Sequence, residues 1–301
     1  MREYGIVCQA SAFLYTEDHK VVTDEVLMGW AVEILEKRCT ADGRASLRVL
    51  THYGYEGYLD GNTVRSASEE ELCNRDLGGS LCVIRKAFAD MMETPKVQGR
   101  ILQTLGKGSF VTRVSEAEHG YCLVETADGA RGYLMEVGLS RRLDDDGYLY
   151  ASDRKDYFLR QSLRKWGSEK AFRDALVDCA KSYLGTQYRW GGKSSSGLDC
   201  SGLTFLCYQM NGILIYRDAK LRPDYPVQPI EPEQIKKGDL LYFPGHIAMY
   251  LGRGRYIHCT GNKESFGCVC NSLCPTAADY REDLAKNILN VGSIENALKL
   301  C

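Results

Sequence analysis

The chain has 301 residues, of which 44% are hydrophobic and 26% charged, a composition typical of globular proteins with room for two or three domains. Its formal net charge of −2 argues against a polyanion-binding surface, so we expect no nucleic-acid partner. No apolar run approaches the roughly 18 residues of a membrane span, and the first residues lack the apolar core of a secretory signal. We therefore expect a cytoplasmic protein that does not bind a membrane.

The first two-thirds of the chain predicts short strands separated by glycines. Two stretches share one order, in which strand-like residues lead to a Gly-Tyr-Leu turn. They lie at 30–36, 46–51 and 57–59, and again at 109–114, 120–126 and 132–134. We interpret them as two diverged copies of one small β-barrel, over residues 1–65 and 80–145.

Two polar segments are expected to connect the domains. Residues 66–80 are acidic and linker-like, and a second junction runs from Arg141 to about Arg164. The acidic runs in both segments predict solvated surface.

The last third of the chain predicts an α+β domain over residues 165–301. Ser168 can cap a helix that ends at Gly185, and a second helix begins at Cys200 and runs to about residue 211. The first helix has apolar residues at helical spacing, namely Phe172, Leu176, Val177, Ala180 and Leu184. Strand patterns follow at 239–243, 246–251 and 256–260, so the helices precede an antiparallel sheet.

Cys200 and His246 are the two parts that a thiol nucleophile requires. Asp199 is a candidate N-cap, which places Cys200 in the first turn of its helix. A helix N-terminus and a nearby imidazolium both lower a thiol pKa, so we expect a thiolate near neutral pH. The alternative is a buried structural cysteine. The Gly-Leu-Asp before Cys200 and the Ser-Gly after it favour the nucleophile.

The turn between the last two strands decides whether His258 can act on His246. A two-residue loop at Arg253-Gly254 puts the two imidazoles on opposite faces. A three-residue loop with a bulge at Gly254 instead puts His258 opposite Ala248, diagonal to His246 on one face. We favour the bulged loop because it lets the imidazoles meet.

The remaining cysteines do not predict a metal site. The chain has 13 cysteines and no signal peptide, so we expect reduced thiols. Cys259, Cys268, Cys270 and Cys274 lie near His258 but lack the paired spacing of zinc knuckles. We therefore expect neither metal nor cofactor.

Several motifs of the last 135 residues or so together resemble the NlpC/P60 family of papain-like cysteine peptidases. They are Tyr188-Arg189-Trp190-Gly191-Gly192, Leu198-Asp199-Cys200-Ser201-Gly202, Gly238-Asp239-Leu240, His246 with its strand, and Tyr256-Ile257-His258. The two upstream β-units resemble bacterial SH3 domains. The implied fold class is an α+β papain-like catalytic domain preceded by two small all-β SH3-like barrels.

The resemblance implies a role for each matching residue. Cys200 becomes the nucleophile, His246 the general base and His258 the residue that orients it. Tyr188, Asp199 and Ser201 match residues that line the substrate cleft. In relatives, a tyrosine of the first SH3-like domain helps to bind the free amine of the substrate, together with the aspartate before the cysteine and an upstream glutamate. Tyr55 is our candidate for that tyrosine, with Tyr53 as the alternative. Glu25, in the segment Thr23-Asp24-Glu25-Val26-Leu27, is the candidate for the upstream glutamate.

The resemblance also implies a substrate. Relatives with this domain order are cytoplasmic endopeptidases that cut the bond between γ-D-glutamate and a diamino acid, lysine or diaminopimelate, in free murein peptides. Two alternatives stay open: an amidase or acyltransferase that uses the same cysteine and histidine, and a non-catalytic peptidoglycan-binding module. The sequence leaves the oligomeric state open.

Overall fold

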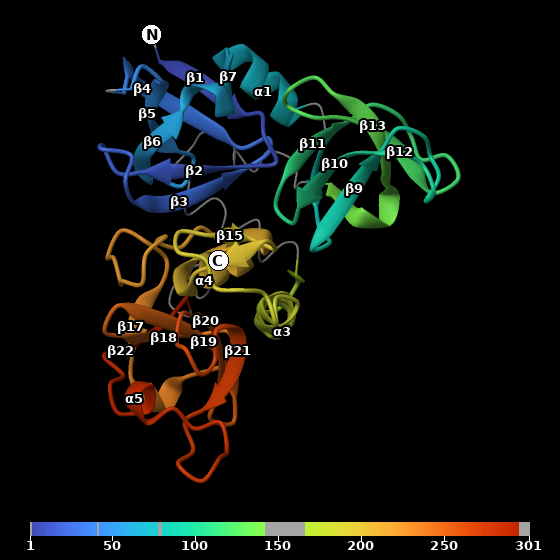
Figure 1. Cartoon of the computed structure of the whole chain (residues 1–301). Helices are drawn as coiled ribbons and strands as arrows, with labels where there is room; N and C mark the ends of the chain where they lie inside the picture. The colour runs from blue at the N-terminus through green and yellow to red at the C-terminus, as the bar shows by residue number, and fades with distance from the viewer. Residues whose placement is uncertain (1, 41, 78–79, 142–165, 295–301) are drawn as a thin grey trace. The chain divides into compact units, whose positions relative to one another are not determined.

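The computed structural model describes residues 2–40, 42–77, 80–141 and 166–294, and the chain forms two compact units, residues 1–152 and 153–301 (Figure 1). The N-terminal unit carries two antiparallel sheets, and the C-terminal unit is α+β. Apart from Arg141, the second predicted junction lies outside the described residues, as do the last seven residues of the predicted catalytic domain.

The first sheet is a seven-stranded antiparallel barrel with strand order β3-β2-β6-β5-β4-β1-β7. Its strands are β1 (Glu3–Val7), β2 (Ser11–Tyr15), β3 (Val22–Leu27), β4 (Ala31–Cys39), β5 (Ala45–Thr51), β6 (Glu56–Asp60) and β7 (Val64–Ala67). Side chains alternate between the core and solvent along β2 and β6, which is the pattern of a sheet with one buried face.

The second sheet repeats this architecture with strand order β10-β9-β13-β12-β11-β8-β14. Its strands are β8 (Leu81–Ile84), β9 (Phe88–Met92), β10 (Ile101–Gly106), β11 (Phe110–Arg113), β12 (Tyr121–Glu125), β13 (Arg131–Met135) and β14 (Leu139–Arg141). The two Gly-Tyr-Leu segments occupy matching strands, β6 and β13, each followed by a short 3-10 helix, η1 (Gly61–Thr63) or η2 (Glu136–Gly138). The repeat is therefore real, but the segments are strands rather than the turns that we expected.

The segment predicted as a linker contains a helix, α1 (Glu69–Leu77). The Ser68 hydroxyl accepts a hydrogen bond from the Glu71 amide at 3.0 Å, and three acidic residues fill the first turn, where the helix dipole favours them. Leu72 is fully buried, and Arg75 donates to the Gly29 carbonyl at 2.9 Å. The polar composition suggested a linker, whereas a cap and one buried leucine make a helix packed on the barrel.

The C-terminal unit places two helices ahead of a six-stranded antiparallel sheet of order β17-β22-β18-β19-β20-β21. Its helices are α3 (Glu169–Lys181), α4 (Cys200–Met210), the short α5 (Glu282–Ala285) and the 3-10 turn η3 (Pro232–Gln234). Its strands are β17 (Gln228–Ile230), β18 (Leu240–Phe243), β19 (His246–Gly252), β20 (Arg255–Thr260), β21 (Gly267–Ser272) and β22 (Asn290–Ser293), with β15 (Lys193–Ser194) and β16 (Gly197–Leu198) forming a separate small hairpin. The predicted order of helices and sheet is confirmed.

Helix α3 is held to the sheet by a buried ion pair. Ser168 caps the helix, as predicted, by accepting from the Ala171 amide. Arg173 donates to the Asp239 carboxylate at 2.7 Å, and Ser293 donates to the same oxygen at 2.7 Å. Leu184, which we placed on the buried face, lies beyond the helix and is exposed. Asp239 of the Gly-Asp-Leu motif therefore joins α3 to β18 and β22.

Helix α4 is buried along nearly its whole length and packs against β19, β20 and α3. Its Tyr208 hydroxyl donates to the Gly238 carbonyl at 2.6 Å. Residues from Cys200 to Gln209 are buried on every side of the helix. Because α4 is buried along its length, the position of its first residue, Cys200, is fixed by the packing of the whole helix.

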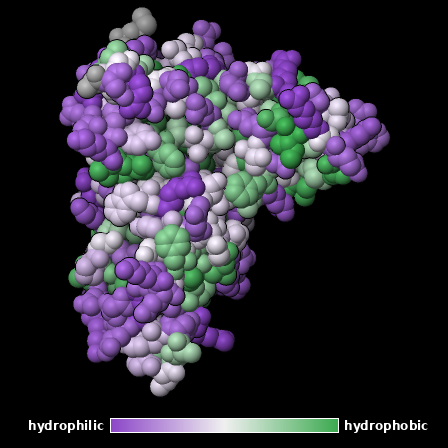
Figure 2. Space-filling model, in the orientation of Figure 1, coloured by the Kyte–Doolittle hydropathy of each residue, from purple (hydrophilic) through white to green (hydrophobic). Residues whose placement is uncertain are grey.

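The surface drawn in Figure 2 is mostly hydrophilic, with apolar residues exposed in separate groups. In the C-terminal unit the large exposed apolar side chains include Trp190 and Phe266. Over the described residues, every helix is too short or too polar to cross a membrane.

Candidate active site

Cys200 is the first residue of α4, as the sequence predicted. Asp199 has extended backbone angles, and its Oδ1 accepts a hydrogen bond from the Gly202 amide at 2.5 Å, which makes it the N-cap. A Cβ added at Gly202 would lie 2.0 Å from the Gly192 carbonyl oxygen. The glycine after Ser201 therefore lets the first turn of α4 pack directly on the loop that precedes it.

A buried arginine holds the Asp199 carboxylate from both sides. Arg217 donates from Nη1 to Asp199 Oδ1 at 3.1 Å and from Nη2 to Oδ2 at 3.0 Å. It also donates to the Ser201 hydroxyl at 2.7 Å and to the Gly191 carbonyl at 3.0 Å. Only 2% of Arg217 and 7% of Asp199 is exposed, so this is a buried charge pair. It joins three segments of chain at the start of α4.

The β19–β20 hairpin combines the two turns that we had treated as alternatives. Its tip is a two-residue loop, in which Arg253 and Gly254 both have positive φ and Gly252 pairs with Arg255. A bulge at Leu251 then shifts the register, so that Met249 pairs with Ile257. The same register continued puts His258 opposite Ala248. The predicted placement of the histidines is thus confirmed, whereas the three-residue loop that we favoured is wrong.

His246, His258 and Asn271 form a hydrogen-bonded chain. His246 Nε2 lies 2.7 Å from His258 Nδ1, and His258 Nε2 lies 2.9 Å from Asn271 Oδ1. Asn271 Nδ2 donates to the Asp279 carbonyl at 2.7 Å, which fixes the orientation of the amide because a carbonyl only accepts.

This amide orientation determines the tautomers. Since Asn271 presents an oxygen, His258 carries its proton on Nε2, and in its neutral form it accepts at Nδ1. His246 then donates from Nε2 and keeps the lone pair on its own Nδ1. Neutral His246 therefore has one basic atom, Nδ1, which is not used in the chain.

The thiol of Cys200 is buried against the start of β19. Burial raises its pKa to about 11, and the charge of Asp199 acts in the same direction. The backbone N–H of Ile247 and the charge of Arg217 favour the thiolate but do not outweigh burial. Burial also lowers the pKa of His246 to about 3. Both shifts favour the neutral thiol and the neutral imidazole, which is the opposite direction to the thiolate that we expected near neutral pH.

Tyr188 lies next to Cys200. Its pKa is raised by burial and by the nearby charges of Cys200 and Asp199. A Cβ added at Gly261 would lie 3.2 Å from the Tyr188 ring, and the exposed Phe266 packs edge-on against that ring with centroids 6.2 Å apart. Tyr188, Asp199 and Ser201 are thus brought together around the thiol.

Comparison with known proteins identifies the family. The NlpC/P60 family model matches residues 185–274. The chain is 36% identical over 297 residues to dipeptidyl-peptidase 6 of Lysinibacillus sphaericus, a match that covers 96% of this chain and 99% of that protein. The chain belongs to the NlpC/P60 family. A γ-D-glutamyl-L-lysine dipeptidyl-peptidase of Bacillus cereus is 39% identical over 93 residues, which is 28% of each protein.

A solved NlpC/P60 structure shows the same fold over the whole chain. The crystal structure of a family protein from Bacillus cereus superposes with a TM-score of 0.71 at 19% identity, and the match covers 96% of this chain and 98% of that one. The predicted fold class, a papain-like α+β domain after two small SH3-like barrels, is confirmed.

Tyr53 and Tyr55, the tyrosine candidates outside the NlpC/P60 domain, lie beside the acidic strand β3. Tyr53 is buried and donates its hydroxyl to Asp24. Tyr55 is partly exposed, and its hydroxyl donates to the Thr23 carbonyl at 3.4 Å. Glu25 is fully buried on the same strand. Because Tyr53 is buried, Tyr55 stays the candidate for substrate contact.

The cysteines near His258 do not gather around it. Cys259 and Cys268 lie opposite each other on β20 and β21, and both are buried free thiols. Cys270 is partly buried and Cys274 is exposed. Burial raises the pKa of Cys268 to about 12. No three His, Cys, Asp or Glu side chains within the described ranges are grouped closely enough to hold a metal ion.

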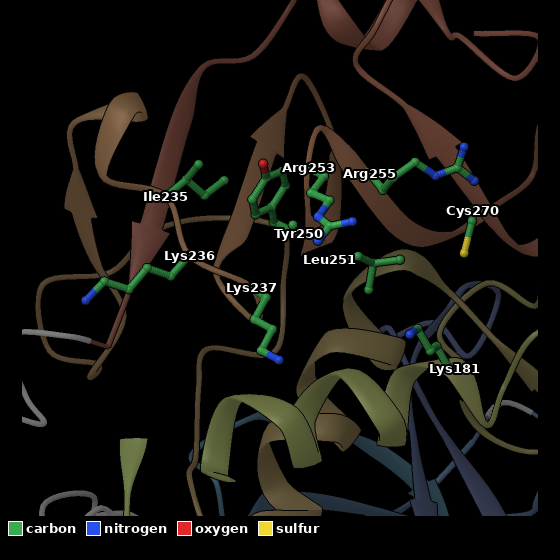
Figure 3. Close-up of a pocket in the computed structure, with 10 residues that line it drawn as sticks. Lys181, Ile235, Lys236, Lys237, Tyr250, Leu251, Arg253, Arg255 and Cys270 are labelled. Carbon is green, nitrogen blue, oxygen red and sulfur yellow. The ribbon is translucent and has the colours of Figure 1, made fainter. Parts of the chain in front are cut away.

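A basic depression of about 810 Å³ lies at the other end of β19 from His246 (Figure 3). Its lining includes Lys236, Lys237 and Arg255, and each of these already pairs with a carboxylate outside it. The pairs are Lys236 with Glu169, Lys237 with Asp174, and Arg255 with Asp279. Lys181 and Arg253 also line it, so its positive charge is only partly offset. The depression is separate from Cys200.

Sequence reasoning missed Arg217 and Asn271. Asn271 follows Val269 on β21, and Val269 pairs with His258, so the amide lies diagonal to His258 on one face. The alternation of residues 268–271 was the available signal for Asn271. Arg217 lies in an irregular segment, and no local pattern points to its partner, Asp199.

Proposed function

We propose that this NlpC/P60 protein is a cysteine peptidase that hydrolyses the bond between γ-D-glutamate and the diamino acid of free murein stem peptides, releasing L-Ala-γ-D-Glu. The observation that carries the proposal is the chain from His246 through His258 to Asn271 beside a helix-capped Cys200. The relative matched over 99% of its own length is a dipeptidyl-peptidase, and a second relative is named for the γ-D-glutamyl-L-lysine bond.

The chemistry follows from the tautomers. As Cys200 Sγ attacks the carbonyl carbon, its proton moves to His246 Nδ1, so the charged pair forms only during the reaction. The His246 imidazolium donates that proton to the leaving nitrogen of the diamino acid, and the C–N bond breaks to leave a thioester. Water then attacks the thioester carbon while Nδ1 accepts a proton from it. The C–S bond breaks, the L-Ala-γ-D-Glu acid is released, and the proton on Nδ1 returns to Cys200 Sγ. His258 stabilises the imidazolium by accepting from its Nε2, and Asn271 holds His258 in the required tautomer.

The start of α4 supplies the oxyanion site in this proposal. Backbone N–H groups of the first helical turn, including that of Cys200, point toward the carbonyl oxygen as it becomes negative. Arg217 fixes this turn by holding Asp199 and Ser201. The donors are therefore in place before the substrate binds.

Recognition of the free amine of L-alanine is assigned to Tyr188, Asp199, Ser201 and Tyr55. Arg217 offsets the charge of Asp199, so Asp199 by itself provides little net negative charge for an ammonium group. A peptide whose alanine nitrogen is acylated, as in intact cell wall, is expected to be rejected. The natural substrate is then a released peptide, and we propose a cytoplasmic location on that ground.

Mass-spectrometric hydrolysis of L-Ala-γ-D-Glu-diamino-acid tripeptides, free and N-acetylated, tests the proposal. We expect cleavage of the free peptide alone, and loss of that cleavage in the Cys200→Ala variant. Equal cleavage of both peptides would refute the proposed recognition of the free amine but would still support the peptidase activity. If neither peptide were cleaved, the acyltransferase and binding-module alternatives would replace the proposal.

A further inference from the structure

A second pocket, of about 540 Å³, lies between two loops of the sheet. One wall is the loop between β20 and β21, with Asn262, Lys263 and Glu264. The other is the segment after β21, from Tyr280 to Asp283. Opposite charges line both walls, which is unusual for a pocket that takes an apolar group.

Arg281 is held ready to bind a carboxylate in this pocket. It donates from Nε to Asp283 Oδ1 at 2.7 Å and from Nη2 to Asp283 Oδ2 at 2.5 Å. Its Nη1 donates to the Ser265 hydroxyl at 3.2 Å. A guanidinium has five N–H donors, so these three bonds fix its plane and leave two donors for a ligand. Asp283 offsets the charge of Arg281, so recognition of a carboxylate depends on these two directed donors.

Glu264 provides the opposite charge across the pocket. It is exposed, and its negative charge acts on Arg281. The Asn262 side chain accepts from the Glu264 amide at 2.8 Å, which sets the course of the loop. Among the described residues, no ion pair is formed by the Glu264 carboxylate at the distance of a salt bridge. A group with one ammonium and one carboxylate would complement Glu264 and Arg281 together.

The segment that forms one wall of the pocket is joined to the histidine chain through Asn271. The Asp279 carbonyl accepts from Asn271, and the next residue, Tyr280, bridges to Ser272 of β21. Arg281 follows directly, and its charge acts on both His246 and His258. Since His246 must contact the leaving nitrogen, the residue that carries this nitrogen lies on the histidine side of the cleft.

We propose that this pocket binds the side-chain end of the diamino acid, and that Arg281 and Glu264 select an amino-carboxylate group there, as in diaminopimelate, over the lone ammonium of lysine. The proposal rests on the proposed function. It assigns the substrate carboxylate to Arg281 and the substrate ammonium to Glu264.

Three tripeptides test it: one with diaminopimelate, one with diaminopimelate amidated on its side-chain carboxylate, and one with lysine. We expect kcat/KM for the first to exceed the other two by at least about 10-fold, the factor that a charge-assisted hydrogen bond contributes. Arg281→Gln should reduce this preference to nearly one, and Arg281→Lys should retain part of it. Lys170→Met, which removes an exposed charge on α3, is the matched control.

Three results would overturn the proposal. Equal kcat/KM for all three peptides would remove the selectivity and leave the peptidase intact. An equal loss for all three in Arg281→Gln would assign Arg281 to the main-chain carboxylate that they share. If the wild type cleaved none of the peptides, the proposed function would fail. The affinities of the same peptides for the Cys200→Ala variant would then test the pocket separately. Equal affinities for the three peptides, unchanged by adding Arg281→Gln, would refute the pocket proposal as well.

Discussion

Replacing Arg217 with methionine tests whether a single buried cation organises the start of α4. The change keeps much of the side-chain volume but removes four hydrogen bonds, two of them to the Asp199 carboxylate. Asp199 then stays buried without its counter-charge. Breaking a buried ion pair by removing one partner costs about 3–5 kcal/mol. Asp199 still accepts from the amides of Gly191 and Gly202, so we expect a value near the lower end.

Calorimetry of the full chain measures the effect, with Arg222→Met as the control. Arg222 pairs with Asp224 at 3.3 Å on the surface, where a pair contributes at most about 1 kcal/mol. For a unit of this size, 3 kcal/mol corresponds to a fall in Tm of about 6–12 °C. The transition of the C-terminal unit should shift by that amount in Arg217→Met and hardly at all in the control.

A double-mutant cycle makes the prediction refutable. Asp199→Asn combined with Arg217→Met removes both charges, so the double variant should be more stable than the sum of the single effects predicts, by about 2–3 kcal/mol. Arg217→Met should also slow alkylation of Cys200 by iodoacetamide at a given pH, because Arg217 lowers the pKa of that thiol. Additive stability effects, or an unchanged alkylation rate, would show that Arg217 neither compensates Asp199 nor acts on the thiol.

Three further predictions concern the histidine chain and the fold. The pKa values of about 11 for Cys200 and about 3 for His246 predict that kcat/KM is flat between about pH 5 and 9. The fall in kcat/KM at acid pH should come from protonation of His246. A rate of Cys200 alkylation that titrates below pH 7 would contradict this. Asn271→Ala should lower kcat by up to about 100-fold with little change in KM. Asn271→Asp should move the acid limb of the pH profile to higher pH, because a carboxylate favours the imidazolium. An unchanged pH profile in Asn271→Asp would argue against contact between residue 271 and His258. Asp239→Asn should destabilise the C-terminal unit by about 2–3 kcal/mol, because it removes one of the two carboxylates that bind Arg173 and leaves Glu169 as the other. A Tm within about 2 °C of wild type would refute this.

Local patterns predicted the parts of the site that depend on neighbours in sequence. The cap at Asp199 and the cysteine after it were found because a helix start is set by residues within one turn. The helix at Ser168 was found in the same way. Local composition misled at helix α1, which we predicted as a linker. There Leu72 is buried and Arg75 donates to the Gly29 carbonyl of the barrel.

The hairpin shows where sequence reasoning stops. Alternation placed His246 and His258 on strands, but whether they met depended on one residue of register. The structure uses a two-residue tip and a bulge at Leu251, and both turns are compatible with the same glycines. Strand register is decided by the packing of a whole face, which the turn residues alone do not specify.

The sequence by itself determined that the chain has two β-barrels and an α+β domain with a helix-capped cysteine and two strand histidines. Only the tertiary structure decided that Asn271 completes the chain, that Arg217 compensates Asp199, and that burial raises the pKa of the Cys200 thiol. These last properties depend on contacts between residues far apart in sequence and on burial from water. Burial is set by everything that packs around a group, so no local pattern can give its effect on a pKa.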